Sequence, residues 1–243
     1  PLIGVYDSIF TLSDATIKNH QGELLNATRS TIKIRGTNSF TNESSSTGCM
    51  IYFGSINFNF EGISTINGTN NNGCSAFNMR LSTGTFENIT ISSPNNALYA
   101  ISSDVYIKGG SFSSTGENAI SAREGSRFEI ESSKNNISIT SDSTEDEALE
   151  IRDGAFAKIK KGSNTLSIDA PNYSPDLIVK GKSHAIIDTD GTITSVGIKE
   201  MSYLELDSGT ISVLSCEKKS YAEKDGGSID AVSGDCNYGS NSY

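Results

Sequence analysis

The chain has 243 residues and a formal net charge of -10, from 19 Lys and Arg against 29 Asp and Glu. This acidic balance excludes a nucleic-acid-binding protein, because neutralising phosphates requires a basic surface. Hydrophobic residues form 35% of the sequence and recur throughout it, which favours a folded chain over a disordered one. No stretch approaches the roughly 18 consecutive apolar residues that a membrane-spanning helix needs.

A short apolar strand recurs along the chain. Its copies begin at residues 24, 50, 75, 97, 119, 148 and 177, at intervals of 26, 25, 22, 22, 29 and 29 residues. A second strand follows each copy, as at residues 31–34 and 104–107, and a shorter apolar pair often closes the unit. Apolar and polar residues alternate in these strands, which is typical of a strand with one buried face. Three short strands in a unit of roughly 20–30 residues indicate one coil of a β-helix.

We therefore predict an all-β fold, a single-stranded, right-handed parallel β-helix of roughly eight to nine coils with three short strands per coil. An antiparallel β-sandwich is the alternative, because its strands have a similar spacing. One domain is expected to span residues 1–243, with residues 1–22 as an N-terminal cap or first coil and residues 234–243 as a C-terminal tail or linker. Extra residues at 141–147 and 170–175 are expected to bulge from a corner of the coil.

The four cysteines are placed at coil spacing. Cys49 and Cys74 each directly precede a copy of the recurring strand, and Cys216 and Cys236 lie 20 residues apart. Stacked positions bring Cα atoms roughly 5 Å apart, which a disulfide accepts. We predict the bridges Cys49–Cys74 and Cys216–Cys236, and with them an oxidising, extracellular location.

No catalytic set is visible in the sequence. Neither of the two histidines, His20 and His184, lies beside a nucleophile with an orienting acid, and a solvent-facing strand position is expected for His184. The segment Asp188-Thr189-Asp190-Gly191 resembles the Asn-Thr-Asp-Gly segment of polygalacturonases, with Asp188 in place of Asn. The paired Asp-Asp, Gly-His-Gly and Arg-Ile-Lys motifs of that family are absent, and a turn that closes a strand explains both aspartates. We expect a protein that is not an enzyme.

No cofactor is expected. The densest acidic run offers oxygen ligands for calcium, but it lacks the spacing of known calcium loops, and a charge run in a corner is usually solvated. The run consists of Asp142, Glu145, Asp146, Glu147 and Glu150.

Six Asn-x-Ser/Thr sequons are candidate glycosylation sites if the source is a eukaryote, although most arise by chance in a chain so rich in these residues. They lie at Asn26, Asn42, Asn67, Asn88, Asn136 and Asn172.

The coil-length repeats, the alternating Ile and Phe strands and the Asn/Ser/Thr/Gly corners resemble β-helical surface proteins, such as autotransporter passengers and chlamydia-type polymorphic outer membrane proteins. Phe86-Glu87-Asn88-Ile89 and Phe40-Thr41-Asn42 are similar to the Phe-x-x-Asn repeats of the latter, with a spacing one residue short. Their Gly-Gly-Ala-Ile repeat is absent, and Gly226-Gly227-Ser228-Ile229 is only similar to it. The resemblance implies a β-helix at a cell surface and transfers no functional residue.

Two functions follow from these observations. The first is a non-catalytic extracellular module, structural or adhesive, of a cell surface or surface filament. Its partners would be surface glycans or neighbouring β-helix subunits, joined end to end or laterally. The alternative is a glycan-binding or polysaccharide-cleaving β-helix of the tailspike or lyase kind, a polysaccharide hydrolase or lyase if it is an enzyme. Tyr52, Tyr99 and Tyr106 would stack on sugars if they form a stripe on one face.

Overall fold

The computed structural model describes residues 1–19, 22–42, 49–68 and 73–240. Within these ranges the chain consists of strands joined by turns, and every strand pairing is parallel. No helix in the described part is long and apolar enough to cross a membrane. The predicted all-β solenoid is confirmed in this form, an all-parallel β solenoid.

The strands lie on three faces, which we name by the order in which the chain visits them. Face A is a ladder of short strands, and the C-terminal parts of two long strands and of β26 continue it. Its short strands are β1 (Ile3–Tyr6), β4 (Leu25–Thr28), β7 (Ile51–Gly54), β10 (Phe77–Arg80), β13 (Leu98–Ile101), β16 (Ile120–Arg123), β19 (Leu149–Ile151) and β22 (Leu177–Val179). The long strands are β23 (His184–Ile198) and β24 (Tyr203–Cys216), and β26 spans Ser228–Gly234.

Face B follows face A in every turn of the chain and also includes the first parts of β23 and β24. Its other strands are β2 (Ile9–Ser13), β5 (Thr31–Arg35), β8 (Asn57–Phe60), β11 (Thr83–Phe86), β14 (Asp104–Ile107), β17 (Arg127–Glu131), β20 (Phe156–Lys160), β25 (Tyr221–Lys224) and β27 (Asn237–Ser240). Face C is a separate ladder of β3 (Thr16–Asn19), β6 (Thr37–Asn42), β9 (Ile63–Gly68), β12 (Ile89–Ser93), β15 (Gly110–Ser114), β18 (Ile137–Ser141) and β21 (Leu166–Asp169).

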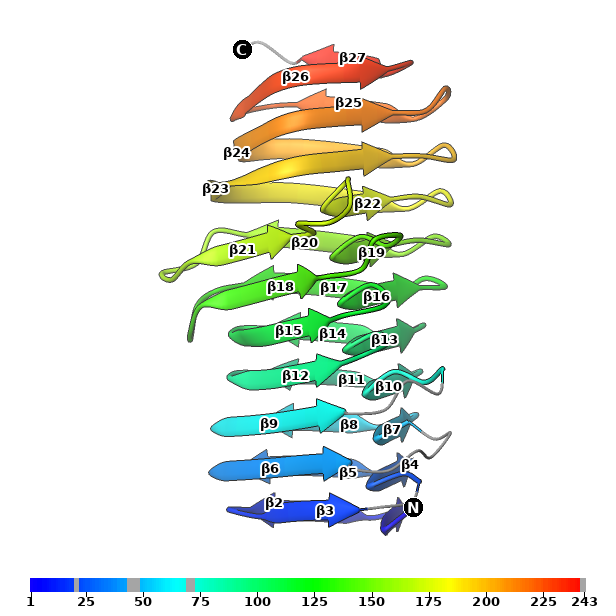
Figure 1. Ribbon diagram of the computed structural model, residues 1–243, viewed down its shortest axis with the longest axis vertical. Coiled ribbons are helices and arrows are strands. Elements are labelled where there is room, and N and C mark those ends of the chain that lie inside the picture. The colour runs from blue at the N-terminus through cyan, green and yellow to red at the C-terminus, as the bar shows by residue number, and fades with distance from the viewer. Residues whose placement is uncertain (20–21, 43–48, 69–72, 241–243) are drawn as a thin grey trace.

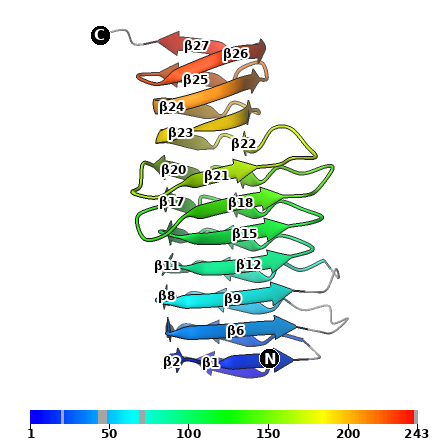
Figure 2. The ribbon, with the colours of Figure 1, turned by 60° about the vertical axis from the view of Figure 1, so that its left-hand side comes forward.

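The rungs are stacked along one axis from the N-terminus to the C-terminus (Figures 1 and 2). In the half nearest the C-terminus, β23 and β24 run around a corner without a break and replace the separate short strands of the earlier rungs. The segments expected to bulge do lie at corners, because they connect β18 to β19 and β21 to β22.

The register of face A corrects the sequence alignment by one residue in two places. Leu25, Ile51, Phe77, Leu98, Ile120, Leu149 and Leu177 are partners in consecutive strands. Ser75 and Leu177 were taken as the first residues of their strand copies, whereas Ala76 and Asp176 occupy those positions. Cys49 therefore lies two residues before Ile51, whereas Cys74 lies three residues before its register partner Phe77. The disulfide between the two cysteines still forms, with Cα atoms 5.0 Å apart.

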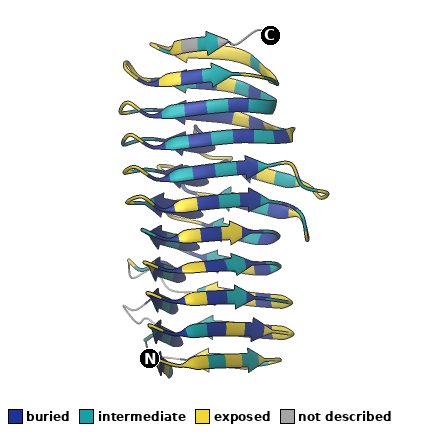
Figure 3. Cartoon of the chain, turned by 180° about the vertical axis from the view of Figure 1, so that it is seen from behind, coloured by how far each residue is buried: buried dark blue, intermediate teal, exposed yellow. Residues whose placement is uncertain are grey.

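The interior of the solenoid is filled by every second residue of the strands. Buried and more exposed positions alternate along many of the strands in Figure 3, as in β5 and β14, because successive side chains of a strand point to opposite sides. Phe53, Phe58, Phe60, Phe77 and Phe86 form one aromatic cluster in this core, with ring centroids 4.9–6.4 Å apart. Each rung alone would leave these rings in water, so stacking supplies the hydrophobic stabilisation.

The sharp corner between faces A and B has a recurring construction. A residue with positive φ is followed by a serine, as in Arg29-Ser30, Leu81-Ser82 and Ser102-Ser103. The Ser82 hydroxyl donates to the carbonyl of Arg80 at 2.7 Å and accepts the Ile56 amide of the neighbouring rung at 3.3 Å. Ser103 and Ser126 repeat this pattern, so the serines satisfy backbone groups that the bend leaves unpaired.

The proposed tail at residues 234–243 needs a correction. Residues 237–240 form β27, which pairs with β25, and the disulfide Cys216–Cys236 joins this rung to the one before it, with Cα atoms 4.9 Å apart. Much of this segment therefore belongs to the solenoid, and residues 241–243 lie outside the described residues. The expected first coil is observed as β1, β2 and β3.

The corner at Leu81 yields a test of backbone strain. Leu81 has φ of 49° and a side chain 68% exposed. Asn adopts this left-handed conformation more readily than Leu, so Leu81→Asn is expected to stabilise the fold by about 0.5–1 kcal/mol. Leu81→Val, which is β-branched, should destabilise it by a similar amount. Urea unfolding of the three proteins measures the difference, and an order of stability with Val above Asn would contradict this account.

Candidate functional site

A groove of about 500 Å³ lies where face A meets the corner that comes from face C, and we call it the face A groove. Asn78 on β10, Tyr99 on β13 and Arg123 on β16 line it from the strands. Asn78 and Tyr99 are register partners on adjacent strands, so 21 residues of sequence separate two neighbouring side chains. The guanidinium of Arg123 lies 5.1 Å from the centroid of the Tyr99 ring, which holds the ring in place by a cation–π contact.

The corner supplies the remaining groove residues. Asn96 and Asn118 each lie two residues before a face A strand, and Glu117 and Asp146 belong to the corners before β16 and β19. Asn96 and Asn118 are almost fully buried, whereas Glu117 and Asp146 are half-buried. The groove therefore combines one aromatic ring, several amides, two carboxylates and one guanidinium.

A ladder of hydrogen bonds connects the corners and fixes their positions. The Ser75 hydroxyl donates to Asn96 Oδ1 at 3.3 Å, and Asn96 Nδ2 donates to the carbonyl of Asn118 at 3.0 Å. Asn118 Nδ2 then donates to the carbonyl and to Oε2 of Glu147, at 3.0 and 3.1 Å. Separately, the carboxylate of Asp176 in the corner before β22 accepts the amide of Ser195 at 2.8 Å. Since these buried polar groups are hydrogen-bonded to the next rung, they hold the groove wall in one arrangement.

Glu150 on β19 is the centre of an ion cluster beside the groove, which we call the Glu150 cluster. Its side chain is 3% exposed and contacts Arg123 Nη2 at 2.9 Å, Lys180 Nζ at 2.8 Å and Arg152 Nη1 at 3.5 Å. The Ser121 hydroxyl donates to the same carboxylate at 2.6 Å. Burial opposes its ionisation, but the hydrogen bonds from Lys180 and Ser121 and the charge of Arg123 outweigh burial and hold the pKa of Glu150 below its usual value.

The carboxylates that line the groove are shifted in the opposite direction. Burial, followed by the charge of Asp146, raises the pKa of Glu117. Burial also raises the pKa of Asp146, with the charge of Glu150 acting in the same sense. Because Arg123 and Lys180 are held by Glu150, neither carboxylate of the groove has a cation hydrogen-bonded to it among the described residues. The groove therefore contains negative charge that its own cations do not fully compensate.

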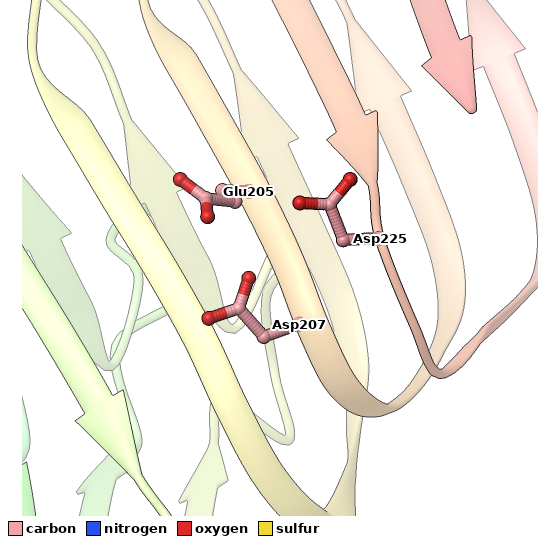
Figure 4. Close-up of side chains that lie close together, drawn as sticks. All are labelled: Glu205, Asp207 and Asp225. Carbon is pink, nitrogen blue, oxygen red and sulfur yellow. The ribbon is translucent and has the colours of Figure 1, made fainter. Parts of the chain in front are cut away.

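A second polar surface lies on face B near the C-terminus. Glu205 and Asp207 on β24 and Asp225 after β25 point toward one another (Figure 4), and their ligand atoms all lie within 4.8 Å. Burial, followed by Asp207 and the other neighbouring carboxylates, raises the pKa of Glu205. We call this group the Glu205 cluster, the set of carboxylates in the described part of the chain with the geometry to hold a metal ion.

An aromatic stripe runs beside the Glu205 cluster. Phe156, His184, Tyr203 and Tyr221 occupy the same register position on consecutive strands, and their ring centroids lie 4.6–5.4 Å apart. Burial lowers the pKa of His184, so its contact with Glu205 at 3.7 Å is not an ion pair at neutral pH. Burial and a hydrogen bond to Glu223 raise the pKa of Tyr203. The sequence predicts a solvent-facing strand position for His184, and the structure places its half-buried ring within this stack.

The residues singled out from the sequence are only partly brought together. Both predicted disulfides are present. The acidic run separates, because Asp146 lines the groove, Glu150 is ion-paired and Glu147 belongs to the polar ladder. The expected turn at Asp188-Thr189-Asp190-Gly191 is instead an irregularity inside β23, and His20 lies outside the described residues.

Tyrosines and sequons also differ in their placement. Tyr52 and Tyr99 lie on face A, separated by Asn78, whereas Tyr106 is on face B, so the three do not form one stripe. Among the sequons, Asn42 is buried, Asn26 and Asn88 are half-buried, and the remaining three are exposed. A glycan on the folded chain requires a solvent-facing amide, which favours Asn67, Asn136 and Asn172.

Sequence reasoning missed most of the groove. Asn96, Asn118, Glu117 and Arg123 were not singled out, although a signal exists. A polar residue directly precedes the recurring alanine in Asn96-Ala97, Asn118-Ala119 and Glu147-Ala148, which marks one corner position in consecutive coils. In the same way, an aromatic residue follows the corner serine or alanine at each position of the aromatic stripe.

No protein-family model, curated protein or solved structure matches this chain.

The Glu150 cluster yields a stability prediction. Removing a buried carboxylate leaves its cations uncompensated, and because these cations are partly exposed we expect Glu150→Ala to destabilise the fold by about 2–3 kcal/mol. The matched control is Glu129→Ala, whose carboxylate pairs with Lys160 at 2.7 Å on the surface of face B. This control should cost less than about 1 kcal/mol. Chemical unfolding measures both, and equal losses would contradict the assigned role of Glu150.

The opposite pKa shifts predict how stability depends on pH. Glu117, Asp146 and Glu147 have raised pKa values, so they bind protons more readily in the folded chain, and stability increases as the pH falls from neutral toward about 4.5. Glu150 has a lowered pKa, so its contribution is present above its unfolded pKa of about 4.3 and is lost as the pH falls through its folded value. We expect maximal stability at mildly acidic pH.

Unfolding curves recorded at a series of pH values measure this dependence. Glu150→Gln should flatten the acidic limb and also reduce the slope above it, because the charge of Glu150 helps to raise the pKa values of Glu117, Asp146 and Glu147. A stability that rises steadily from acidic to alkaline pH would show that the pKa values of Glu117, Asp146 and Glu147 are not raised in the folded chain.

Proposed function

We propose that this chain is a non-catalytic extracellular module that acts as an adhesive element of a cell surface or surface filament and binds a glycan in the face A groove. The proposal includes a right-handed winding and an architecture similar to that of β-helical surface proteins. In the described part of the chain, face A contains eleven stacked strands, which is more than the eight to nine coils expected from the sequence. The observation that carries the proposal is the groove itself, where a tyrosine ring is surrounded by amides and carboxylates on a rigid stack of strands.

The chemistry of the groove suits a sugar. Sugars present apolar ring faces and hydroxyl groups at their edges, so they are bound by an aromatic ring together with amides and carboxylates. Tyr52 lies two strands from Tyr99 on the same outward ladder, a distance of roughly 9.6 Å at the usual strand spacing. A second aromatic contact at this distance supports an extended saccharide that runs along the axis of the solenoid.

The disulfides support the extracellular location. Both bridges join neighbouring rungs, and disulfides persist in oxidising compartments. Calcium and glycosylation stay as secondary predictions. The Glu205 cluster is a more convergent set of oxygens than the acidic run at residues 142–150.

Neighbouring subunits are a second class of partner in this proposal. The first rung exposes apolar side chains, and exposed apolar patches mark interaction surfaces. These side chains are Leu2, Tyr6 and Ile9, which are 55%, 54% and 77% exposed.

The alternative function is cleavage of the polysaccharide. The specific observation that favours it is the presence of two carboxylates with raised pKa values, Glu117 and Asp146, in one groove. Glycosidases use a pair of carboxyl groups on the two sides of the scissile bond, one of them with a raised pKa.

A glycan array combined with a reducing-end assay separates the two functions. We expect binding without turnover, and we expect Tyr99→Ala to weaken binding at least about tenfold, which corresponds to about 1.4 kcal/mol. Tyr106→Ala, which removes an exposed tyrosine from face B, is the matched control and should leave binding unchanged. Release of new reducing ends would establish the alternative, and equal effects of the two substitutions would place the binding site elsewhere.

A further inference from the structure

Given the glycan binding proposed above, the charge of the groove lining determines which glycans the face A groove binds. Arg123 is the cation of the groove lining. Its Nη2 and Nε atoms both donate to Glu150 Oε2, at 2.9 and 3.2 Å, and Nε also donates to Ser121 at 2.8 Å. These bonds occupy Nε and one Nη2 donor, so Glu150 already compensates the charge of the guanidinium, and a carboxylate on a ligand would meet only the remaining Nη donors of a cation that is already paired.

The other cations beside the groove are held in the same way. Lys180 contacts Glu150 at 2.8 Å, and Arg152 contacts Asp153 at 2.8 Å and Glu150 at 3.5 Å. These contacts direct positive charge toward Glu150 and Asp153. On the groove side, Glu117 and Asp146 come from consecutive corners and repel each other.

We propose that the face A groove binds glycans with free amino groups, such as glucosamine oligosaccharides, and discriminates against uronic-acid glycans. The ammonium group lies between Glu117 and Asp146, and the sugar ring packs on Tyr99 with a hydroxyl group against Asn78. A charge-assisted hydrogen bond to a partly desolvated carboxylate is stronger than one between neutral groups. A uronate would meet the same two carboxylates and a chain with a net charge of -10.

The Glu205 cluster provides an internal comparison. It places three carboxylates together on face B, but the aromatic rings beside it stack on one another, and the groove described above is on another face. It therefore exerts the same non-specific attraction on a cation without the amides and the aromatic ring of the groove. Removing carboxylates from this cluster changes the net charge of the protein by the same amount as removing them from the groove.

The test measures binding at about pH 6 and again at about pH 7, because amines are protonated below their pKa and the raised pKa values of Glu117 and Asp146 leave more of each carboxylate ionised at the higher pH. The ligands are a glucosamine oligosaccharide, its fully N-acetylated counterpart of equal length, an oligogalacturonate of equal length and an oligolysine. Calorimetry is carried out with the wild-type chain, with the double variant Glu117→Gln/Asp146→Asn, and with the matched control Glu205→Gln/Asp225→Asn.

We expect the glucosamine oligosaccharide to bind about tenfold more tightly than its N-acetylated counterpart, and the oligogalacturonate to bind most weakly. The preference should fall to about twofold or less in the Glu117/Asp146 variant and persist in the Glu205/Asp225 control. Both variants have the same net charge, so loss of the preference in both would reduce the effect to general electrostatics and overturn the proposal.

Two further outcomes distinguish this inference from the function on which it rests. Tight binding of the oligogalacturonate or of neutral sugars alone would overturn the ligand class and leave the adhesive function in place. Binding of oligolysine as tight as that of the glucosamine oligosaccharide would show a cation site without sugar recognition. If no glycan binds the wild-type chain, here or on the array, the proposed function itself fails.

Discussion

The structure depends on one constraint, the parallel backbone register between consecutive rungs. Each strand is hydrogen-bonded to the strands above and below it, and a shift by one residue would turn its apolar side chains from the core to the solvent. Leu25, Ile51, Phe77 and Leu98 are in register across four rungs and all are fully buried. The hydrophobic core and the backbone ladder therefore specify the same alignment.

The same register builds the groove. Asn78 and Tyr99 are adjacent because Phe77 and Leu98 are stacked in the core, and the outward side chains follow the inward ones. Glu150 lies directly above Ser121 for the same reason, which places a buried carboxylate next to Arg123. Binding chemistry on the outside of the solenoid is thus a consequence of packing on the inside, because a strand has only two sides.

Corner length adds the variation that a uniform stack lacks. Leu98 and Ile120 are separated by 22 residues, whereas Ile120 and Leu149 are separated by 29. Four of the seven additional residues lie between β17 and β18, and two lie in the corner before β19, which carries Asp146 beside Glu117. The insertions do not disturb the ladder, since the strands on both sides of them keep their register. A recessed site therefore forms where coils of different length adjoin.

The sequence by itself determined the parts that depend on periodicity. Alternation of apolar residues, the recurrence of Ala-Leu and Ala-Ile pairs at coil spacing, and the placement of Cys49 and Cys74 before consecutive strands were sufficient to predict a parallel solenoid and both disulfides. Only the tertiary structure decided which outward side chains meet. Tyr52 and Tyr99 share a face, whereas Tyr106 lies on another, and the acidic run divides between a groove and an ion cluster. A register offset of a single residue, or a different path of one corner, changes which outward side chains are neighbours without altering the repeat pattern of the sequence.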